Sequence, residues 1–254
     1  MDEHSKEGHD WTSAHSTPWD APLVPLFPFE MRDVDILTVF YRSDSAAIQA
    51  VLPDPLEAQG DVVAIHIYRM NDTDHLGAYN ESAIQVGAAL PGGSVVGAFS
   101  PYLFLDSDGA VAAGREVYGQ PKKFGSPKIS IRQDTIVGTV KRNGIRVLRV
   151  TTPYKRKRAD ISEATDMLPF VTNLNYKLIP DVSGQPAIRQ ITARELLDVS
   201  VKECWRGPAT VEISPHIQAP VHRLPVREML DGFYWRCDFT LGPGRVVHDY
   251  FETK

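Results

Sequence analysis

Residues 36–42, ILTVFYR, and residues 62–70, VVAIHIYRM, decide the fold class of this chain. Both stretches are rich in β-branched and aromatic side chains, which fit the pleated surface of a strand. Residues 145–152, IRVLRVTT, alternate apolar and polar side chains more openly, as in a strand with one face in water. Further strands are expected at residues 94–99, 128–132, 135–140, 210–213 and 235–241, with turn residues between them.

Helical signals are fewer and shorter. Residues 43–52, SDSAAIQAVL, predict a capped helix that ends before Pro53. Residues 161–168 and 192–197 are further candidates, and the second begins with a Thr-x-x-Glu capping box. Many short strands and few helices predict an α+β chain that is predominantly antiparallel β.

Composition excludes several classes of protein. The chain has 254 residues, of which 43% are hydrophobic and 23% are charged, as in an ordinary globular protein. Lys and Arg number 27 against 32 Asp and Glu, a net charge of −5, which argues against a nucleic-acid partner. The basic run at residues 155–158 is expected to be a solvated face or a subunit contact. No stretch approaches the roughly 20 apolar residues of a membrane span, so no membrane partner is expected.

Residues 1–20 predict a flexible N-terminal segment, followed by a single domain over residues 21–254. The segment has no apolar core for a secretory signal, and the chain has only two cysteines, so a cytoplasmic setting is expected. His4, His9 and His15 lie in this segment without regular spacing, and the other histidines show no ligand pattern either. The glycine-rich turns lack a nucleotide fingerprint. We therefore expect no metal and no cofactor.

Residues 114–128, GREVYGQPKKFGSPK, carry the strongest chemical signal. Two lysines, Lys122 and Lys123, follow Pro121 among apolar and small residues. A lysine pair alone is usually a solvated turn, but an amine in such surroundings loses hydration and becomes neutral more easily. A neutral amine can attack a ketone and form a Schiff base, whose protonated form accepts the electrons of a breaking C–C or C–H bond.

This motif resembles the lysine motif of the acetoacetate decarboxylase family, in which lysine activation is an established example of such chemistry. Collinear segments continue the resemblance from about residue 21 to the C-terminus: residues 41–44, 76–82, 154–157, 177–180, 207–208, 219–220, 224–226 and 249–250. The resemblance implies a barrel-like or cone-like β core, with Lys122 inside it as the Schiff-base lysine, and assembly into a homo-oligomer. It also places Glu81 near that amine, where a carboxylate could shuttle protons.

The resemblance assigns to Lys123 the role of lowering the proton affinity of Lys122. However, neighbouring side chains of an extended chain point to opposite faces, so the two ammonium groups need not be close. We therefore expect loss of hydration at Lys122 to favour its neutral form more than repulsion from Lys123 does. In the alternative role, Lys123 anchors its loop by hydrogen bonds or an ion pair.

Two positions depart from the family pattern. Val34 stands where acetoacetate-specific members carry an arginine, with Arg32 two positions away, and His66 stands where they carry a second glutamate. Valine cannot hold a carboxylate and histidine changes the proton inventory, so a substrate other than acetoacetate is expected. His66 is either a pocket residue or a hydrogen-bonded core histidine. Tyr118 and Tyr250 either line the pocket or simply pack.

Three functions follow from these patterns. The first is a lyase that decarboxylates a β-keto acid through an imine on Lys122. The second is an aldolase-dehydratase or cyclase-dehydratase that uses the same imine on an oxo acid. The third is a non-catalytic β-barrel module that binds a carbonyl compound or a protein, which retention of a costly buried amine disfavours. The expected partner of the first two is a small oxo acid.

Overall fold

A computed structural model describes residues 16–18, 21–24 and 27–252 of the chain. Most of the predicted flexible segment 1–20, including His4, His9 and His15, therefore lies outside the described residues. The single domain over residues 21–254 stays a prediction. Among the described helices, none has the length and apolar character needed to cross a membrane.

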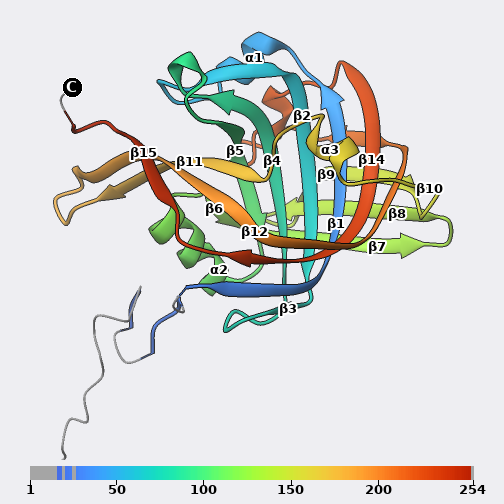
Figure 1. The fold of residues 1–254 in the computed structure, drawn as a ribbon, viewed down its shortest axis with the longest axis horizontal. Coiled ribbons are helices and arrows are strands. Elements are labelled where there is room, and N and C mark those ends of the chain that lie inside the picture. The colour runs from blue at the N-terminus through green and yellow to red at the C-terminus, as the bar shows by residue number, and fades with distance from the viewer. Residues whose placement is uncertain (1–15, 19–20, 25–26, 253–254) are drawn as a thin grey trace, which may run out of the picture.

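Within the described residues, seven long strands close into a ring (Figure 1). Around the ring they follow the order β12, β11, β5, β4, β2, β1 and β14, and β14 pairs back with β12. The neighbours are antiparallel except for β11 and β5, which are parallel. Their bounds are β1 (Phe29–Arg42), β2 (Glu57–Met70), β4 (Tyr79–Ala89), β5 (Val96–Leu105), β11 (Thr172–Pro180), β12 (Pro186–Pro208) and β14 (Glu228–Leu241). The expected barrel-like, mainly antiparallel β fold is confirmed.

A second sheet and short elements surround the ring. The second sheet has the order β13 (Thr210–Ile213), β9 (Ile145–Pro153), β8 (Thr135–Arg142) and β7 (Ser126–Arg132). Short strands extend the ring sheet: β3 (Asp72–Thr73), β6 (Lys122–Phe124), β10 (Lys157–Arg158) and β15 (Arg245–Asp249). The helical segments are α1 (Ser45–Gln49), η2 (Pro91–Gly93), α2 (Asp108–Ala112), η3 (Ala113–Tyr118), α3 (Ser162–Thr165) and η4 (Val221–Arg223).

Residues 34–41 of strand β1 are buried on both faces, which explains why this part of the strand is mainly apolar. Leu37 and Val39 belong to one core cluster, shared with Val150 of the second sheet, while Ile36 and Phe40 belong to another inside the ring. Successive side chains of a strand point to opposite faces, so one strand serves two cores. The second sheet lies across β1 and β2 (Figure 1).

The close approach of the second sheet depends on Gly138 in β8. A Cβ atom there would lie 2.4 Å from Ile67 Cδ1 and 2.9 Å from Val150 Cγ2. A larger residue at position 138 would therefore displace the side chains of Ile67 and Val150 that pack there.

The expected helix at residues 192–197 is wrong, because these residues belong to β12. Thr192 pairs with Asn175 of β11 on one side and with Val246 of β15 on the other, so both backbone edges are hydrogen-bonded as strand. Glu195 does not act in a capping box, since Thr172 Oγ1 donates to its carboxylate at 2.5 Å. The other two predicted helices are present but shorter than expected, as α1 and α3.

A buried carboxylate ties three strands of the ring together. Asp35 on β1 is fully buried and accepts hydrogen bonds from Arg69 of β2 at 2.5 and 3.0 Å, and from Tyr234 at 2.7 Å and Arg236 at 3.0 Å of β14. Burial by itself would raise the pKa of Asp35, but the hydrogen bonds from Tyr234, Arg69 and Asn71 outweigh it and lower the pKa. Asp35 therefore accepts these hydrogen bonds as an ionised carboxylate.

We expect Asp35→Ala to lower the free energy of unfolding by about 2–4 kcal/mol, because it leaves two arginines and a tyrosine without their shared acceptor. Urea denaturation of the purified protein measures this change. Asp61→Ala is the matched control: Asp61 pairs with Arg42 at 2.6 Å at the surface, and its loss should cost less than about 1 kcal/mol. Equal costs for the two variants would contradict the role given to Asp35.

Candidate active site

The interior of the ring encloses a small cavity with about 50 Å³ of free space. Its walls are mostly apolar and aromatic, with a few polar and charged groups. The lining residues come mainly from β1, β2, β4, β6, β12 and β14: Met31, Ile36, Tyr68, Met70, Tyr79, Glu81, Gln85, Gln120, Lys122, Phe170, Arg194, Leu196, Trp235, Phe239 and Leu241. A cavity of this size holds a few water-sized groups, so it suits a small ligand.

Lys122 and Glu81 meet inside this cavity, as the sequence predicted. Lys122 Nζ donates to Glu81 Oε2 at 2.9 Å, and both residues are 7% exposed. Lys122 reaches this position because β6 adds parallel to β5, with Lys122 opposite Leu103, and extends its side chain into the ring. A primary amine and a carboxylate are therefore in direct contact in a space largely closed to water.

The segment before Lys122 forms an irregular helix, which hydrogen bonds hold in place. Helix α2 begins after Ser107, whose hydroxyl accepts from the backbone N–H of Ala110 at 3.3 Å, and it continues as the π-helix η3. Lys177 Nζ donates to the carbonyl of Val117 at 2.9 Å near the end of η3. Arg115 Nη1 then donates to the carbonyl of Lys122 at 3.2 Å and ties η3 to β6. π-Helical turns often occur at functional sites, where they displace the chain that follows.

Gly114 in η3 leaves the space in which the Lys122 side chain lies. A Cβ atom at position 114 would be 2.2 Å from Lys122 Cδ and 2.6 Å from Lys122 Cε. Such distances are far inside van der Waals contact, so any side chain at this position displaces the lysine. The glycine that opens the lysine motif therefore sets the path of the amine.

Lys123 points away from Lys122, as expected for neighbours in a strand. Its Nζ donates to the backbone oxygen and to Oε1 of Gln218, both at 3.2 Å. Burial lowers the pKa of Lys123, and the cations of Arg142 and Arg115 lower it further. Lys123 does not line the cavity, so its contacts match the anchoring role and not direct participation in chemistry.

His66 lies behind the cavity wall and is completely buried. Its Nδ1 is 3.0 Å from Thr38 Oγ1, and its ring centroid lies 5.0 Å from that of Phe170 and 5.8 Å from that of Tyr68, which both line the cavity. Burial lowers the pKa of His66 to about 3, opposed by the side chain of Gln85. The imidazole is therefore neutral at physiological pH and shapes the wall instead of adding charge.

Val34 and Arg32 are the two positions on β1 at which the resemblance raised the question of an arginine. Val34 is fully buried in the core cluster inside the ring. Arg32 is partly exposed and pairs with Glu30, Asp72 and Asp74 at 2.8, 2.7 and 2.5 Å. Arg32 is therefore engaged outside the cavity and does not replace an arginine at position 34.

The two tyrosines lie in different places, and neither lines the cavity. Tyr118 is buried, donates from Oη to the carbonyl of Gly242 at 2.8 Å, and lies with its ring 5.4 Å from the Arg194 guanidinium. Tyr250 lies at the outer side of β12, where its ring contacts His248 and the guanidinium of Arg189. The structure thus brings Tyr118 close to a lining residue and separates Tyr250 from the site.

Sequence reasoning missed Arg194, the third charged residue in the cavity wall. The strand β12 directs Arg194 and Leu196 into the ring, while Ile191 and Ala193 face the outer core. Because a helix was expected over residues 192–197, this alternation was not recognised. The alternation of apolar and polar residues over 191–194, ITAR, was the signal that could have revealed it.

A chain of polar side chains separates the cavity from an open groove on the outside. Gln120 Nε2 donates to Asn173 Oδ1 at 3.3 Å, and Asn173 Nδ2 and Gln85 Nε2 donate to Ser100 Oγ at 2.9 and 3.1 Å. We call these four residues the polar partition. They join β4, β5 and β11 to the turn before β6.

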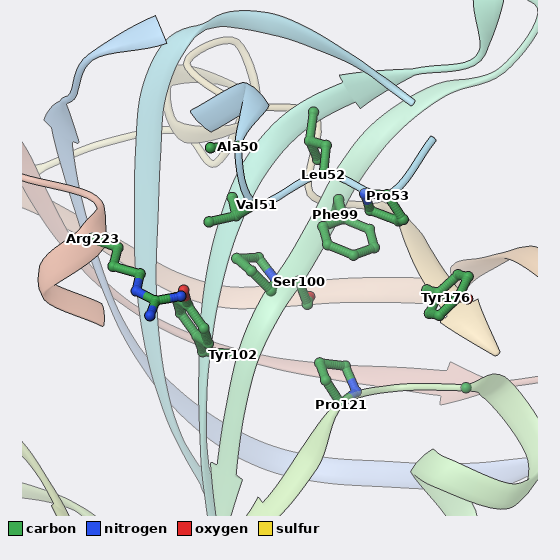
Figure 2. A pocket seen from close by; sticks show the side chains of 12 residues that line it. Ala50, Val51, Leu52, Pro53, Phe99, Ser100, Tyr102, Pro121, Tyr176 and Arg223 are labelled. Atoms are coloured by element: carbon green, nitrogen blue, oxygen red, sulfur yellow. The ribbon is translucent and has the colours of Figure 1, made fainter. Parts of the chain in front are cut away.

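The groove beyond the polar partition has a volume of about 420 Å³ (Figure 2). Pro121 and Tyr176 lie at one end of it, and Tyr102 and Arg223 lie together at the other (Figure 2). Gly119 and Pro121 line the groove, whereas Gln120 and Lys122 line the cavity. The lysine motif therefore forms part of the wall between the two spaces.

A closed β ring with a lysine–glutamate contact in its interior defines a class of proteins that can form a Schiff base inside a barrel. Comparison with known proteins gives the family. The acetoacetate decarboxylase (ADC) family matches residues 13–251. Acetoacetate decarboxylase of Clostridium acetobutylicum is 35% identical over 237 residues, which cover 93% of this chain and 96% of that protein. The Chromobacterium violaceum enzyme is 36% identical, with coverages of 94% and 96%.

A solved structure described as acetoacetate decarboxylase superposes with a TM-score of 0.88 at 34% identity, covering 95% of this chain and 98% of the other. The chain belongs to the acetoacetate decarboxylase family and is a carbon–carbon lyase of the decarboxylase type. The enduracididine biosynthesis enzyme MppR shares the fold, with a TM-score of 0.77 at 19% identity over 93% of this chain and 95% of MppR.

We expect Gly114→Ala to reduce the rate of imine formation at Lys122 by about tenfold or more, because a displacement of about 1 Å at a reacting group can cost this much. Borohydride reduction in the presence of an oxo acid, followed by mass spectrometry, measures the rate. Gly207→Ala is the control, since its added Cβ would come no closer than 3.3 Å to a neighbour. A normal rate in Gly114→Ala would show that Lys122 does not depend on this space.

The buried His66 predicts a loss of stability in acid. Its pKa of about 3 lies below the ordinary value of 6.5, so the unfolded chain takes up a proton at this residue before the folded chain does. As the pH falls from 6.5 to 5, this difference in proton uptake should lower the free energy of unfolding by roughly 1.5 kcal/mol. His66→Gln should remove this part of the slope in urea titrations, and His222→Gln, at an exposed position, should leave it unchanged. Identical slopes in wild type and His66→Gln would contradict the prediction.

Proposed function

We propose that the chain decarboxylates a small β-keto acid other than acetoacetate through an imine on Lys122. The observation that supports this most directly is the 2.9 Å contact between Lys122 Nζ and Glu81 Oε2 inside a cavity of about 50 Å³. The geometry provides a nucleophile, a proton acceptor and an enclosed space at one point, and the relatives are named for decarboxylation of a β-keto acid.

The reaction begins with a proton transfer. Lys122 passes a proton to Glu81 along their hydrogen bond, and the neutral amine adds to the ketone carbon of the substrate. The carbinolamine loses water with a proton supplied by Glu81 and becomes a protonated imine. The bond between the α-carbon and the carboxylate then breaks, carbon dioxide leaves, and its bonding electrons pass into the imine to give an enamine.

The second half of the cycle returns the lysine. Glu81 is ionised again after the dehydration, so water supplies the proton that adds to the enamine carbon. A second water then hydrolyses the protonated imine and releases the ketone and the Lys122 ammonium. Enclosure helps the central step because the substrate carboxylate loses its charge as carbon dioxide forms, and an apolar wall favours that loss. Ile36, Phe170 and Trp235 supply such a wall.

The wall around Lys122 supports a substrate that differs from acetoacetate. Val34 occupies the position at which the resemblance places an arginine, and Arg32 is paired outside the cavity. His66 occupies the position of the second glutamate and is held neutral by burial. The cavity therefore lacks the two charged groups that the resemblance associates with acetoacetate.

Aldol or cyclisation chemistry on the same imine is the second candidate. MppR, which shares the fold, is described in complex with pyruvate and with the condensation product of pyruvate and imidazole 4-carboxaldehyde. In such a reaction the enamine attacks a second carbonyl carbon. The non-catalytic binding module finds no support in the comparisons, since the relatives are enzymes by name. Assembly into a homo-oligomer stays a prediction, which light scattering in solution can measure.

The test is borohydride trapping with a panel of small oxo acids, read by mass spectrometry of peptides. We expect an adduct on Lys122 in the wild type and none in Lys122→Arg, because a guanidinium stays charged and cannot form the imine. Lys128→Arg, at an exposed position of β7, should keep the adduct. Glu81→Gln should lower kcat by about 10²-fold.

Detection of released carbon dioxide then separates the two candidates. Release in proportion to substrate consumed supports decarboxylation, and adduct formation without release supports aldol or cyclisation chemistry. An unmodified Lys122 with every oxo acid, or normal turnover in Lys122→Arg, would overturn the proposal. Far-UV circular dichroism of each variant checks that the fold is intact.

A further inference from the structure

Arg194 is a buried cation that forms no ion pair with any described residue of the chain. It is 9% exposed, and its Nε and Nη1 atoms are buried and have no hydrogen-bond partner within the part of the chain that the structure describes. It lines the same cavity as Lys122 and Glu81. Buried charges in proteins are normally paired, because an unpaired one costs several kcal/mol in lost hydration.

The charges of the cavity wall do not balance. The lining residues with ionised side chains are Glu81, Lys122 and Arg194, and the carboxylate is already in contact with the lysine. The neighbouring His66 is neutral and adds no charge. The wall therefore carries one excess positive charge, located on a guanidinium whose Nε and Nη1 atoms find no hydrogen-bond partner among the described residues. This is the complement of a single carboxylate.

The Arg194 guanidinium is held in place by the ring of Tyr118. Its carbon lies 5.4 Å from the centroid of the Tyr118 ring, within the range of a cation–π contact. Tyr118 is itself fixed, because its hydroxyl donates to the carbonyl of Gly242 at 2.8 Å and its carbonyl accepts from Thr192 Oγ1 at 2.6 Å. Thr192 and Arg194 lie on the same strand of the ring. An arginine fixed in this way offers preorganised N–H donors.

We propose that Arg194 is the carboxylate receptor of the site and selects small oxo acids that carry one carboxylate over neutral carbonyl compounds. The proposal rests on the function proposed above, since it takes Lys122 as the group that meets the carbonyl. In the bound state a carboxylate oxygen accepts a hydrogen bond from Nε or Nη1 of Arg194 while the carbonyl carbon faces Lys122 Nζ. The resemblance places the arginine on β1, whereas this chain carries its own on β12.

The experiment compares each acid with its methyl ester in borohydride trapping. Pyruvate, acetoacetate and 4-oxopentanoate, with their methyl esters, place the carboxyl group one, two and three bonds from the carbonyl carbon. The measured quantity is the ratio of half-saturating concentrations of ester and acid. We expect the wild type to prefer at least one acid, and Arg194→Gln to lower that preference by about 30-fold or more.

Two further variants make the comparison specific. Arg194→Lys keeps the charge but loses the planar guanidinium and its fixed N–H donors, so its preference should lie between those of the wild type and Arg194→Gln. Arg146→Gln, at a surface position paired with Glu212, should retain the wild-type preference. If Arg194→Gln does not fold, the preference of the wild type and of Arg194→Lys decides the outcome.

The experiment distinguishes a failure of the role proposed for Arg194 from a failure of the function proposed for the chain. Equal trapping of acid and ester by the wild type, or an unchanged preference in Arg194→Gln and Arg194→Lys, would overturn the role of Arg194 while leaving the imine intact. If no acid or ester modifies Lys122, the proposed function fails. Calorimetric titration with propanoate, which has no carbonyl group to react, then tests the receptor alone: binding lost in Arg194→Gln supports it, and equal binding refutes it.

Discussion

The contact between Lys122 and Glu81 inside a closed ring is the constraint on which the other features of this protein depend. An amine and a carboxylate are costly to enclose, and the structure contains specific devices that hold them there. The parallel addition of β6 to β5 directs the lysine inward, and the glycine at position 114 leaves room for its side chain. The pairing of β12 with β14 closes the ring around them.

The period of two along the ring strands separates structural from chemical positions. On β1 one set of side chains packs against the second sheet and the other faces the cavity. The same alternation places Glu81 and Gln85 of β4 inside the ring and Ile84 in the outer core. Because the outer faces of these strands keep a continuous apolar core, the inner faces can hold a few polar residues among apolar ones.

Features that depend on the local pattern of residues could be predicted from the sequence. Features that depend on pairing between distant strands could not. The apolar runs in β1 and β2 and the lysine motif were identifiable from composition and order alone. The course of β12 was not, because a Thr-x-x-Glu signal at Thr192 satisfies a local helix rule, while the decisive hydrogen bonds come from β11 and β15. Arg194 was overlooked for this reason. The contact of Lys123 with Gln218, 95 positions away, is equally invisible to local analysis.

Strand β12 has both a structural role and a role in the cavity, whereas many enzymes place these roles on different segments. It completes the ring by pairing with β11 and β14, and it carries Arg194 into the cavity. In many folds the groups that recognise a ligand lie on loops, which tolerate insertions and rapid divergence. Here the recognition group is embedded in the framework, so evolutionary change of ligand preference is confined to single inward-facing substitutions at positions such as 194 and 196. A one-residue insertion in β12 would shift the side chains that follow it in the strand to the opposite face.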